Sequence, residues 1–312
     1  MFTSEFLNNN LEEIYLELNK SGFVEIENVF NEETLQLLDE TILSNKEIIN
    51  INNLSGGYTE NYFFISHFLA LSKEFFNFCT SESIFTICKK YLGEKFYIRS
   101  SRYYETRAVK NNRNIMRWHT DNKNSLGYAE NRGLVFLLFL NNSEGGETQF
   151  IKGSQNWSDK NKKIYFDVKE NSKKLNIITV KTIKNKLLIY DSRGVHQAKI
   201  SKNKSFLRKT LFLQIDIPSV DEKFTSARNC EPIFINSEFL KKITKESEYF
   251  LGFGFKHKAN NPLTSLKEMP YELLTVKKYF SFFFYRFYKY LLSFYEYLLN
   301  ILRGIKRKIK NR

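Results

Sequence analysis

A short stretch near the middle of the chain combines a histidine and an aspartate two positions apart. It reads WHTD over residues 118–121 and supplies His119 and Asp121. On an extended strand, residues two apart point to the same side, so the imidazole and the carboxylate can converge on one point. His196 ends the stretch DSRGVH over residues 191–196, 75 residues after Asp121. Two histidines and one carboxylate form the facial ligand set of non-haem Fe(II) oxygenases, so we expect a metal at these three residues.

A candidate partner for a carboxylate lies further along the chain. Arg208 follows His196 by 12 residues and falls on a predicted strand over residues 206–215. A guanidinium pairs with a carboxylate through two parallel hydrogen bonds, which lysine does less well. A dicarboxylate such as 2-oxoglutarate can therefore chelate the metal at one end and meet Arg208 at the other.

The elements that must position these residues change character near residue 94. Apolar residues at helical spacing predict helices over 4–20, 31–42 and 62–92, the second opened by Asn31 as N-cap. Short runs separated by turn residues then predict strands at 22–26, 96–104, 115–118, 134–140, 147–151, 175–180, 187–190, 196–200 and 207–215. Helices first and strands second indicate an α+β fold with an all-β core, either a sandwich or a barrel.

Together these pieces resemble the phytanoyl-CoA dioxygenase (PhyH-like) branch of the Fe(II)/2-oxoglutarate-dependent dioxygenases. The matching pieces are GFV at 22–24, WHTDN at 118–122, GGETQFIKGS at 145–154, and DSRGVH at 191–196 with the arginine after it. The resemblance covers about residues 20–217 and implies a double-stranded β-helix core (jelly-roll, cupin-like) with flanking N-terminal helices. It implies iron at His119, Asp121 and His196, and the far carboxylate of 2-oxoglutarate at Arg208.

Two further co-substrate positions follow from the resemblance, and two positions depart from it. Thr148 lies in a matched strand beside Gln149, and the pattern leaves open which of the two points inward. Ala198 stands two residues after the distal histidine, where the family often has a serine or threonine that contacts the co-substrate. Gln155 stands where members usually have histidine. Asp121 is intact, whereas related halogenases carry a small residue there, so halogenation is not expected.

Arginines cluster ahead of the metal motif. Arg102 and Tyr104 share one face of the predicted strand 96–104, and Arg117 and Trp118 directly precede His119. Together with Arg193, these residues are candidates for contact with an anionic group of the substrate. The alternative for the arginines is a solvated basic edge strand.

Positive charge is concentrated at the C-terminal end. The chain has 312 residues and a formal net charge of +14, and residues 271–312 carry +8 of it, from ten Lys and Arg against two Glu. Within 279–302, aromatic and aliphatic residues leave one polar stripe at helical spacing, formed by Arg286, Lys289, Ser293, Glu296, Asn300 and Arg303. We expect an amphipathic helix with a basic tail that docks on an anionic membrane surface. Packing on the barrel or on a partner subunit, and a transmembrane span, are the alternatives.

We expect one dioxygenase domain over residues 1–255, with a helical region over 1–93, a jelly-roll core over 94–217 and an irregular region over 218–255. A connector over 256–270 and the amphipathic segment 271–312 follow. The three cysteines lack zinc-site spacing and the N-terminus has no export signal, which indicates a cytoplasmic protein, peripheral on the inner face of a membrane. No groove-reading motif is present, so we expect no nucleic-acid partner.

The activity implied by the resemblance is that of a dioxygenase that uses Fe(II), 2-oxoglutarate and O2. The expected reaction is hydroxylation of a small-molecule, lipid-like or sugar-derived substrate, with release of succinate and CO2. The alternative is a catalytically inactive jelly-roll binding protein, docked on a membrane through its basic C-terminal helix.

Overall fold

A computed structural model provides the structure of the chain. It describes residues 10–52, 56–58, 62–66, 68–108, 118–121, 132–158, 175–199 and 205–217, and the single residues 161, 201, 203, 239, 250, 251, 291, 294, 298 and 302. Of the sequence predictions, Arg117, most of strand 115–118, the connector 256–270 and nearly all of segment 271–312 lie outside the described residues.

The N-terminal region is helical, as predicted, but the third expected helix is wrong over its first residues. The helices are α2 (Leu11–Ser21), α3 (Glu32–Asn52), α4 (Phe68–Leu71), α5 (Lys73–Cys79) and α6 (Glu82–Leu92). Residues 62–66 form a strand instead, and the rest divides into three helices. The side chains of Ser72 and Ser81 accept hydrogen bonds from the backbone of Phe75 and Ile84, so each serine starts a new helix.

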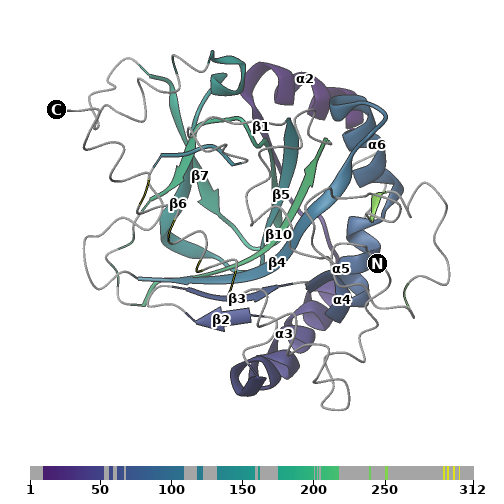
Figure 1. The fold of residues 1–312 in the computed structure, drawn as a ribbon, viewed down its shortest axis with the longest axis vertical. Helices are drawn as coiled ribbons and strands as arrows, with labels where there is room; N and C mark the ends of the chain where they lie inside the picture. The colour runs from purple at the N-terminus through teal and green to yellow at the C-terminus, as the bar shows by residue number, and fades with distance from the viewer. Residues whose placement is uncertain are drawn as a thin grey trace.

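Two antiparallel sheets make up the remainder (Figure 1). The larger has the order β1-β8-β5-β10-β4-β3-β2, and the smaller has the order β7-β6-β9. The strands are β1 (Phe23–Ile26), β2 (Gly56–Tyr58), β3 (Tyr62–Ser66), β4 (Tyr97–Arg107), β5 (Gly133–Phe139), β6 (Ser143–Ile151), β7 (Ile177–Thr182), β8 (Lys186–Asp191), β9 (His196–Ala198) and β10 (Leu207–Asp216). The helices lie along the side of the large sheet that faces away from the small sheet.

Two apolar cores hold these layers together. One joins the helices to the outer face of the large sheet, for example through Leu18, Phe75 and Leu213. The other lies between the sheets and is formed by Phe23, Val135, Phe139, Phe150, Val180, Leu188 and Tyr190. Full burial of one such side chain contributes about 1.5–3 kcal/mol. The apolar cores therefore hold the sheets together, and the α+β prediction is confirmed.

Strand β4 has a face toward the barrel interior. It lies between β10 and β3, so the alternative of a basic edge strand is wrong. Tyr103 packs in the core under the helices, and Ser101 accepts a hydrogen bond from the backbone of Leu69 in α4. Because side chains alternate along a strand, Arg102 and Tyr104 lie on the opposite, inner face.

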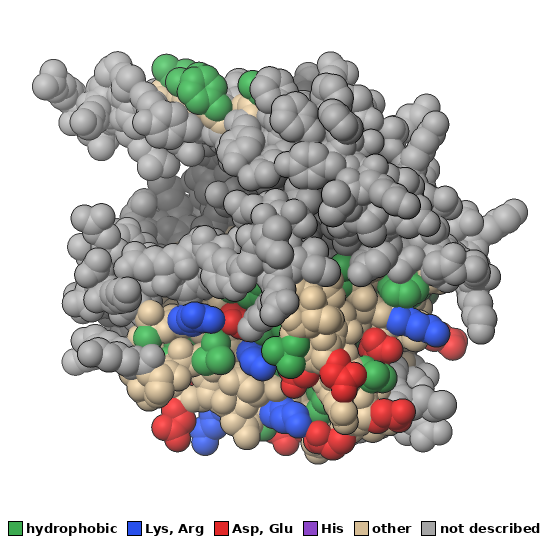
Figure 2. All heavy atoms as spheres, turned by 90° about the horizontal axis from the view of Figure 1, so that it is seen from below, with side chains coloured by type: hydrophobic (Ala, Val, Ile, Leu, Met, Phe, Trp, Pro, Cys, Tyr) green, Lys and Arg blue, Asp and Glu red, His purple; other side chains and the backbone are tan. Residues whose placement is uncertain are grey.

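The described surface shows no single-sign patch on the face drawn in Figure 2. There, Asp and Glu side chains are interspersed with Lys and Arg. None of the described helices is both long enough and apolar enough to span a membrane.

Candidate metal centre

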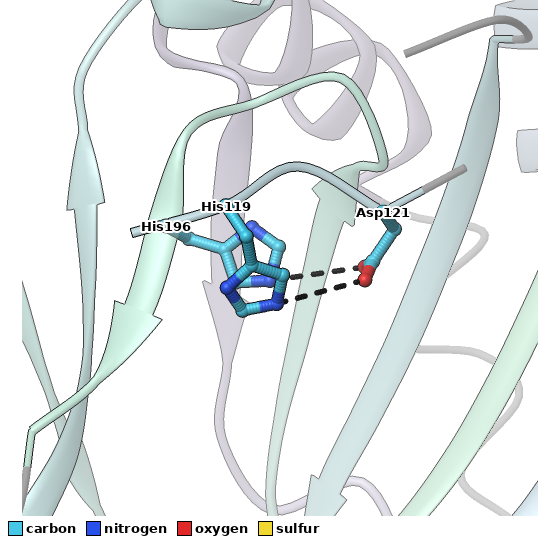
Figure 3. A group of neighbouring side chains, drawn as sticks. All are labelled: His119, Asp121 and His196. Atoms are coloured by element: carbon cyan, nitrogen blue, oxygen red, sulfur yellow. Dashed lines mark ion pairs between the residues drawn. The ribbon is translucent and has the colours of Figure 1, made fainter. Parts of the chain in front are cut away.

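The two histidines of the predicted site are joined through their backbones. His119 N donates to His196 O at 2.8 Å and His196 N donates to His119 O at 2.9 Å, an isolated antiparallel bridge. Residues directly opposite each other across such a bridge present their side chains to the same side. The imidazole ring centroids lie 4.3 Å apart (Figure 3).

Asp121 completes the group from the position predicted by the i, i+2 spacing. Its Oδ1 lies 3.8 Å from His119 Nε2, and its Oδ2 lies 3.7 Å from His196 Nε2. One ligand atom from each residue falls within 4.8 Å of the other two. The side chains of His119 and Asp121 are 21 % exposed and that of His196 is 6 % exposed, so the group is accessible from one side. Two imidazoles and a carboxylate suit a borderline divalent metal such as Fe(II).

Hydrogen bonds behind His196 aim its ring. Its Nδ1 lies 3.0 Å from Gly194 O, so Nδ1 is the protonated nitrogen and Nε2 is left for the metal. The ring stacks on Phe150 at 5.3 Å. Ser154 Oγ accepts a hydrogen bond from Val195 N at 2.7 Å, which anchors the residue before His196 to the turn after β6.

The turn that leads to His196 is held by a buried carboxylate. Asp191 is fully buried and accepts hydrogen bonds from Arg193 Nε at 3.1 Å, from Arg193 Nη2 at 2.7 Å and from Tyr91 Oη at 2.8 Å. The two-point pair with Arg193 closes the turn on itself, and the bond from Tyr91 ties the turn to helix α6. Arg193, a candidate for substrate contact, thus has its guanidinium on Asp191, with 29 % of its side chain exposed.

Tyr190 belongs to the site and was missed by the sequence analysis. Its Oη donates to Asp121 Oδ2 at 3.1 Å, and its ring lies against those of His196 and Phe150. Burial, and then the charge of Asp121, raise the pKa of this phenol, which keeps it a neutral donor. The alternation of side chains along the predicted strand 187–190 could have found it, because Leu188 and Tyr190 share the face of that strand that points inward.

Arg208 is a buried cation on the inner face of β10. Its Nη1 donates to Gly146 O at 2.6 Å, while its Nε is buried without a hydrogen-bond partner. Burial lowers the pKa of the guanidinium to about 10, so it is still charged at neutral pH. No ion pair joins Arg208 to a carboxylate of the described residues. The hydrogen bond to Gly146 joins Arg208 to β6, the strand that pairs with His196 through Phe150. Such a cation fits a ligand that brings its own carboxylate.

The register between β6 and β9 resolves the open choice between Thr148 and Gln149. Thr148 lies opposite Ala198, and Phe150 lies opposite His196. Thr148 is buried on this inner face. Gln149 points to the other face, where it bonds Thr179 and Gln197. Thr148 therefore offers an inward hydroxyl, whereas Ala198 offers no hydrogen-bonding group.

The remaining predicted residues lie as follows. Gln155 is buried and donates to Asn19 O at 2.9 Å, which ties the turn after β6 to the end of α2 rather than entering the metal group. Arg102 Nη1 donates to Tyr104 Oη at 3.0 Å, and the Tyr104 ring meets Phe212 of β10 edge-on. Trp118 is partly buried beside His119.

Comparisons with known proteins identify the fold. No family model and no curated protein matches the chain. The structure is similar to the non-heme alpha ketoglutarate dependent epimerase SnoN from nogalamycin biosynthesis (TM-score 0.52, 13 % identity, 67 % of this chain and 82 % of that one). It is also similar to the carbocyclase SnoK from the same biosynthesis (TM-score 0.52, 12 % identity, 70 % and 90 %). SnoN in complex with Fe3+, alpha ketoglutarate and nogalamycin RO gives a TM-score of 0.50 at 12 % identity, covering 67 % and 84 %. At these identities the similarity establishes the fold, and membership of the PhyH-like branch stays a prediction.

Proposed function

We propose that this chain is an Fe(II)- and 2-oxoglutarate-dependent oxygenase. One observation carries the proposal: ligand atoms of His119, Asp121 and His196 lie within 4.8 Å of one another, between two sheets that also enclose Arg208, a buried cation with no ion pair to a described carboxylate. The three residues come from two distant segments, and a backbone bridge brings them together. Proteins titled as non-heme alpha ketoglutarate dependent enzymes share the fold, which supports the same ligand set here.

The donor set and the fold together favour iron over the common alternatives. Structural zinc sites have four protein ligands and are rich in cysteine, whereas this group has three ligands and no sulfur. Catalytic zinc can also be held by two histidines and a carboxylate, and iron is favoured over it by the fold shared with non-heme alpha ketoglutarate dependent enzymes. Magnesium and calcium prefer oxygen donors. Two histidines and one carboxylate leave half of an octahedral coordination sphere open, as the facial triad of Fe(II) oxygenases does.

The features around Arg208 favour a dicarboxylate as co-substrate. The Nε of Arg208 is a buried donor without a partner. The guanidinium also interacts electrostatically with the phenol of Tyr190. A dicarboxylate supplies one carboxylate for the metal and one for the guanidinium, which removes the cost of the unpaired buried charge. Iron, when bound, would use O2 and 2-oxoglutarate to oxidise the substrate, with release of succinate and CO2.

The chain contributes ligand geometry and a dry enclosure. Gly194, through its carbonyl oxygen, fixes the His196 tautomer, and Phe150 covers one face of that ring. The apolar residues between the sheets exclude water from the inner side of the metal group. Arg102 and Tyr104 line the inner face of β4, where an anionic substrate group can be bound.

We propose hydroxylation of a small-molecule, lipid-like or sugar-derived substrate as the reaction, within the PhyH-like branch. The triad and the motifs at 145–154 and 191–196 support this assignment. Epimerase and carbocyclase are the activities named for SnoN and SnoK, so oxidation with another outcome is the alternative on the same fold.

Succinate formation tests the proposal without knowledge of the substrate. The purified protein is supplied with Fe(II), ascorbate, 2-oxoglutarate and O2, and the succinate formed by slow uncoupled turnover is measured. We expect succinate from the unaltered protein and from Glu144→Ala, which removes an exposed carboxylate of β6, and none from Asp121→Ala. Equal amounts from Asp121→Ala would contradict the assignment of the metal site.

A further inference from the structure

Three tyrosines among the described residues donate hydrogen bonds to carboxylates. Tyr91 donates to Asp191 at 2.8 Å, Tyr103 donates to Glu105 at 2.8 Å, and Tyr190 donates to Asp121 at 3.1 Å. All three tyrosine side chains are buried.

The first two carboxylates differ from the third in their other partners. Asp191 is paired with Arg193, and Glu105 is paired with Arg107. Asp121 has no such arginine among the described residues, and its ion-pair contacts are the two histidines of the metal group. Tyr190 is therefore the one of these three tyrosines that donates its hydrogen bond to a proposed metal ligand.

The two oxygens of Asp121 are not equivalent. Each faces one histidine, Oδ1 at 3.8 Å from His119 Nε2 and Oδ2 at 3.7 Å from His196 Nε2, but only Oδ2 accepts the hydrogen bond of Tyr190. A carboxylate oxygen that is held by a phenol O–H is a poorer metal ligand than its free partner, because one of its lone pairs is occupied.

We infer that Tyr190 is a positioning residue that makes Asp121 a one-point ligand through Oδ1. This inference rests on the proposed function. Iron held by His119, Asp121 and His196 would keep three open positions, which the 2-oxo acid and O2 would need. A carboxylate that bound through both oxygens would take one of these positions.

The surroundings of Tyr190 keep its hydroxyl in place. The ring lies 4.8 Å from that of His196 and 5.1 Å from that of Phe150, and the residue is 4 % exposed. Its backbone is paired on both sides, with Phe23 of β1 and with Val135 of β5. The hydrogen bond is therefore set by the fold before any ligand binds.

Tyr190→Phe tests this role, because it removes the hydroxyl and keeps the ring. Metal affinity is measured with Mn(II) by electron paramagnetic resonance. Affinity for 2-oxoglutarate is measured anaerobically from the visible charge-transfer band of the Fe(II) complex. We expect the Mn(II) affinity to stay within about threefold, because the second oxygen of Asp121 becomes free to bind the metal and replaces the lost support. The 2-oxoglutarate concentration that gives half of the maximal band should rise at least about tenfold, because that oxygen occupies a position the co-substrate needs.

Tyr103→Phe is the matched control. It deletes the same buried phenol–carboxylate bond at Glu105, on the face of β4 that packs under the helices. We expect both affinities to stay at the values of the unaltered protein. If Tyr190→Phe does not fold, Tyr190→Leu, which copies the inward neighbour Leu188, removes the ring as well as the hydroxyl, and the loss of 2-oxoglutarate affinity is then judged relative to the loss of Mn(II) affinity.

Two results would overturn the inference. In one, the 2-oxoglutarate titration of Tyr190→Phe equals that of the unaltered protein. In the other, affinities for Mn(II) and 2-oxoglutarate fall by the same factor, as expected if Tyr190 merely holds the site together. Absence of the band in the unaltered protein would instead contradict the proposed function, so the two failures are distinguishable.

Discussion

Arg208 brings a positive charge between the two sheets and has no ion pair with a carboxylate of the described residues, although the charge of Glu147 acts to raise its pKa. Its hydrogen bonds are incomplete, since Nη1 donates to Gly146 O but the buried Nε has no partner. Burying an unpaired charge is costly, and a fold retains it where a ligand completes the pair. The residue is therefore expected to serve binding rather than stability.

Arg208→Met separates these two roles, because it removes the charge and keeps the length of the side chain. We expect the free energy of unfolding to change by less than about 1 kcal/mol, because relief of the buried charge offsets the bond lost to Gly146. The affinity for 2-oxoglutarate should fall roughly a hundredfold, since two charge-assisted hydrogen bonds of about 1.5 kcal/mol each are lost. Urea unfolding and calorimetric titration measure the two quantities. A loss of several kcal/mol of stability would make Arg208 a structural residue.

The metal ligands could be predicted from the sequence because their signal is local. His119 and Asp121 stand two apart, and the residues before His196 match a known motif. Tyr190 could not be paired with Asp121 in this way. The two are 69 positions apart, and they meet because the segment 118–121 is placed over the end of β8. Thr148 was likewise settled only by its register with Ala198.

At the scale of elements, an irregular stretch inside β6, between Ser143 and Thr148, shapes the Arg208 site. Gly145 and Gly146 have φ angles of 80° and 66°, a region that side chains rarely adopt. A Cβ on Gly146 would lie 2.2 Å from Phe206 Cζ. The carbonyl of Gly146 is also the acceptor for Arg208. Gly146 therefore fixes both the backbone path of β6 and the position of the Arg208 guanidinium.

Gly146→Ala should destabilise the fold and weaken co-substrate binding together. Left-handed strain costs about 1–2 kcal/mol, and displacement of Phe206 adds about 1–3 kcal/mol. Gly153→Ala is the control, since Gly153 also lies in the left-handed region and a Cβ there would make only an ordinary contact, 3.7 Å from Lys20 O. We expect Gly153→Ala to cost only the strain and to leave the affinity for 2-oxoglutarate unchanged. Urea unfolding with a 2-oxoglutarate titration checks both variants. Equal stability losses in the two would show that the contact with Phe206 is unimportant.

Most elements could be predicted because the hydrophobic period changes from helix to strand near residue 94. The failure at 62–92 has a physical reason. Residues 62–66 pair with β4 from Tyr62 opposite Thr106 to Ser66 opposite Arg102, so a tertiary contact overrides a helical pattern. The register between β10 and β4 shifts by one residue, because Gln214 pairs with Ser100 and Ile215 pairs with Ile98. Such a bulge depends on how the two strands pair, so neither strand's sequence predicts it alone.

At the scale of the whole molecule, the C-terminal segment remains a prediction. Four of its residues are described, and Leu291, Phe294, Leu298 and Leu302 are helical with side chains 42–60 % exposed. Their spacing puts them on one helix stripe, opposite the polar stripe that begins at Arg286. The last ten residues add six cations and no carboxylate side chain.

We expect the chain to bind vesicles of anionic lipid and to be released by salt. Leu298→Glu should weaken vesicle binding at least about tenfold, because an apolar contact of about 1.5–3 kcal/mol is lost. Leu43→Glu, at an exposed position of α3, is the control and should bind as the unaltered protein does. Sedimentation with vesicles measures both. Equal binding to neutral vesicles, or a salt-resistant dimer that Leu298→Glu dissociates, would contradict this prediction.

The α+β class follows from the order of the elements along the chain, but the sheet order does not. Phe23 of β1 pairs with Tyr190 of β8, and no local pattern connects strands so far apart. This pairing extends the large sheet by an edge strand next to Tyr190. The sequence thus predicts the residues of the site more readily than the order of the strands that surround it.

The most direct test of the central claim is an anaerobic titration of the metal-free protein with Fe(II) and 2-oxoglutarate. We predict a visible metal-to-ligand charge-transfer band that saturates at one equivalent of iron. The band should be absent in His119→Ala, which stays folded because the apolar cores hold the sheets. A folded, unaltered protein without the band would contradict the account.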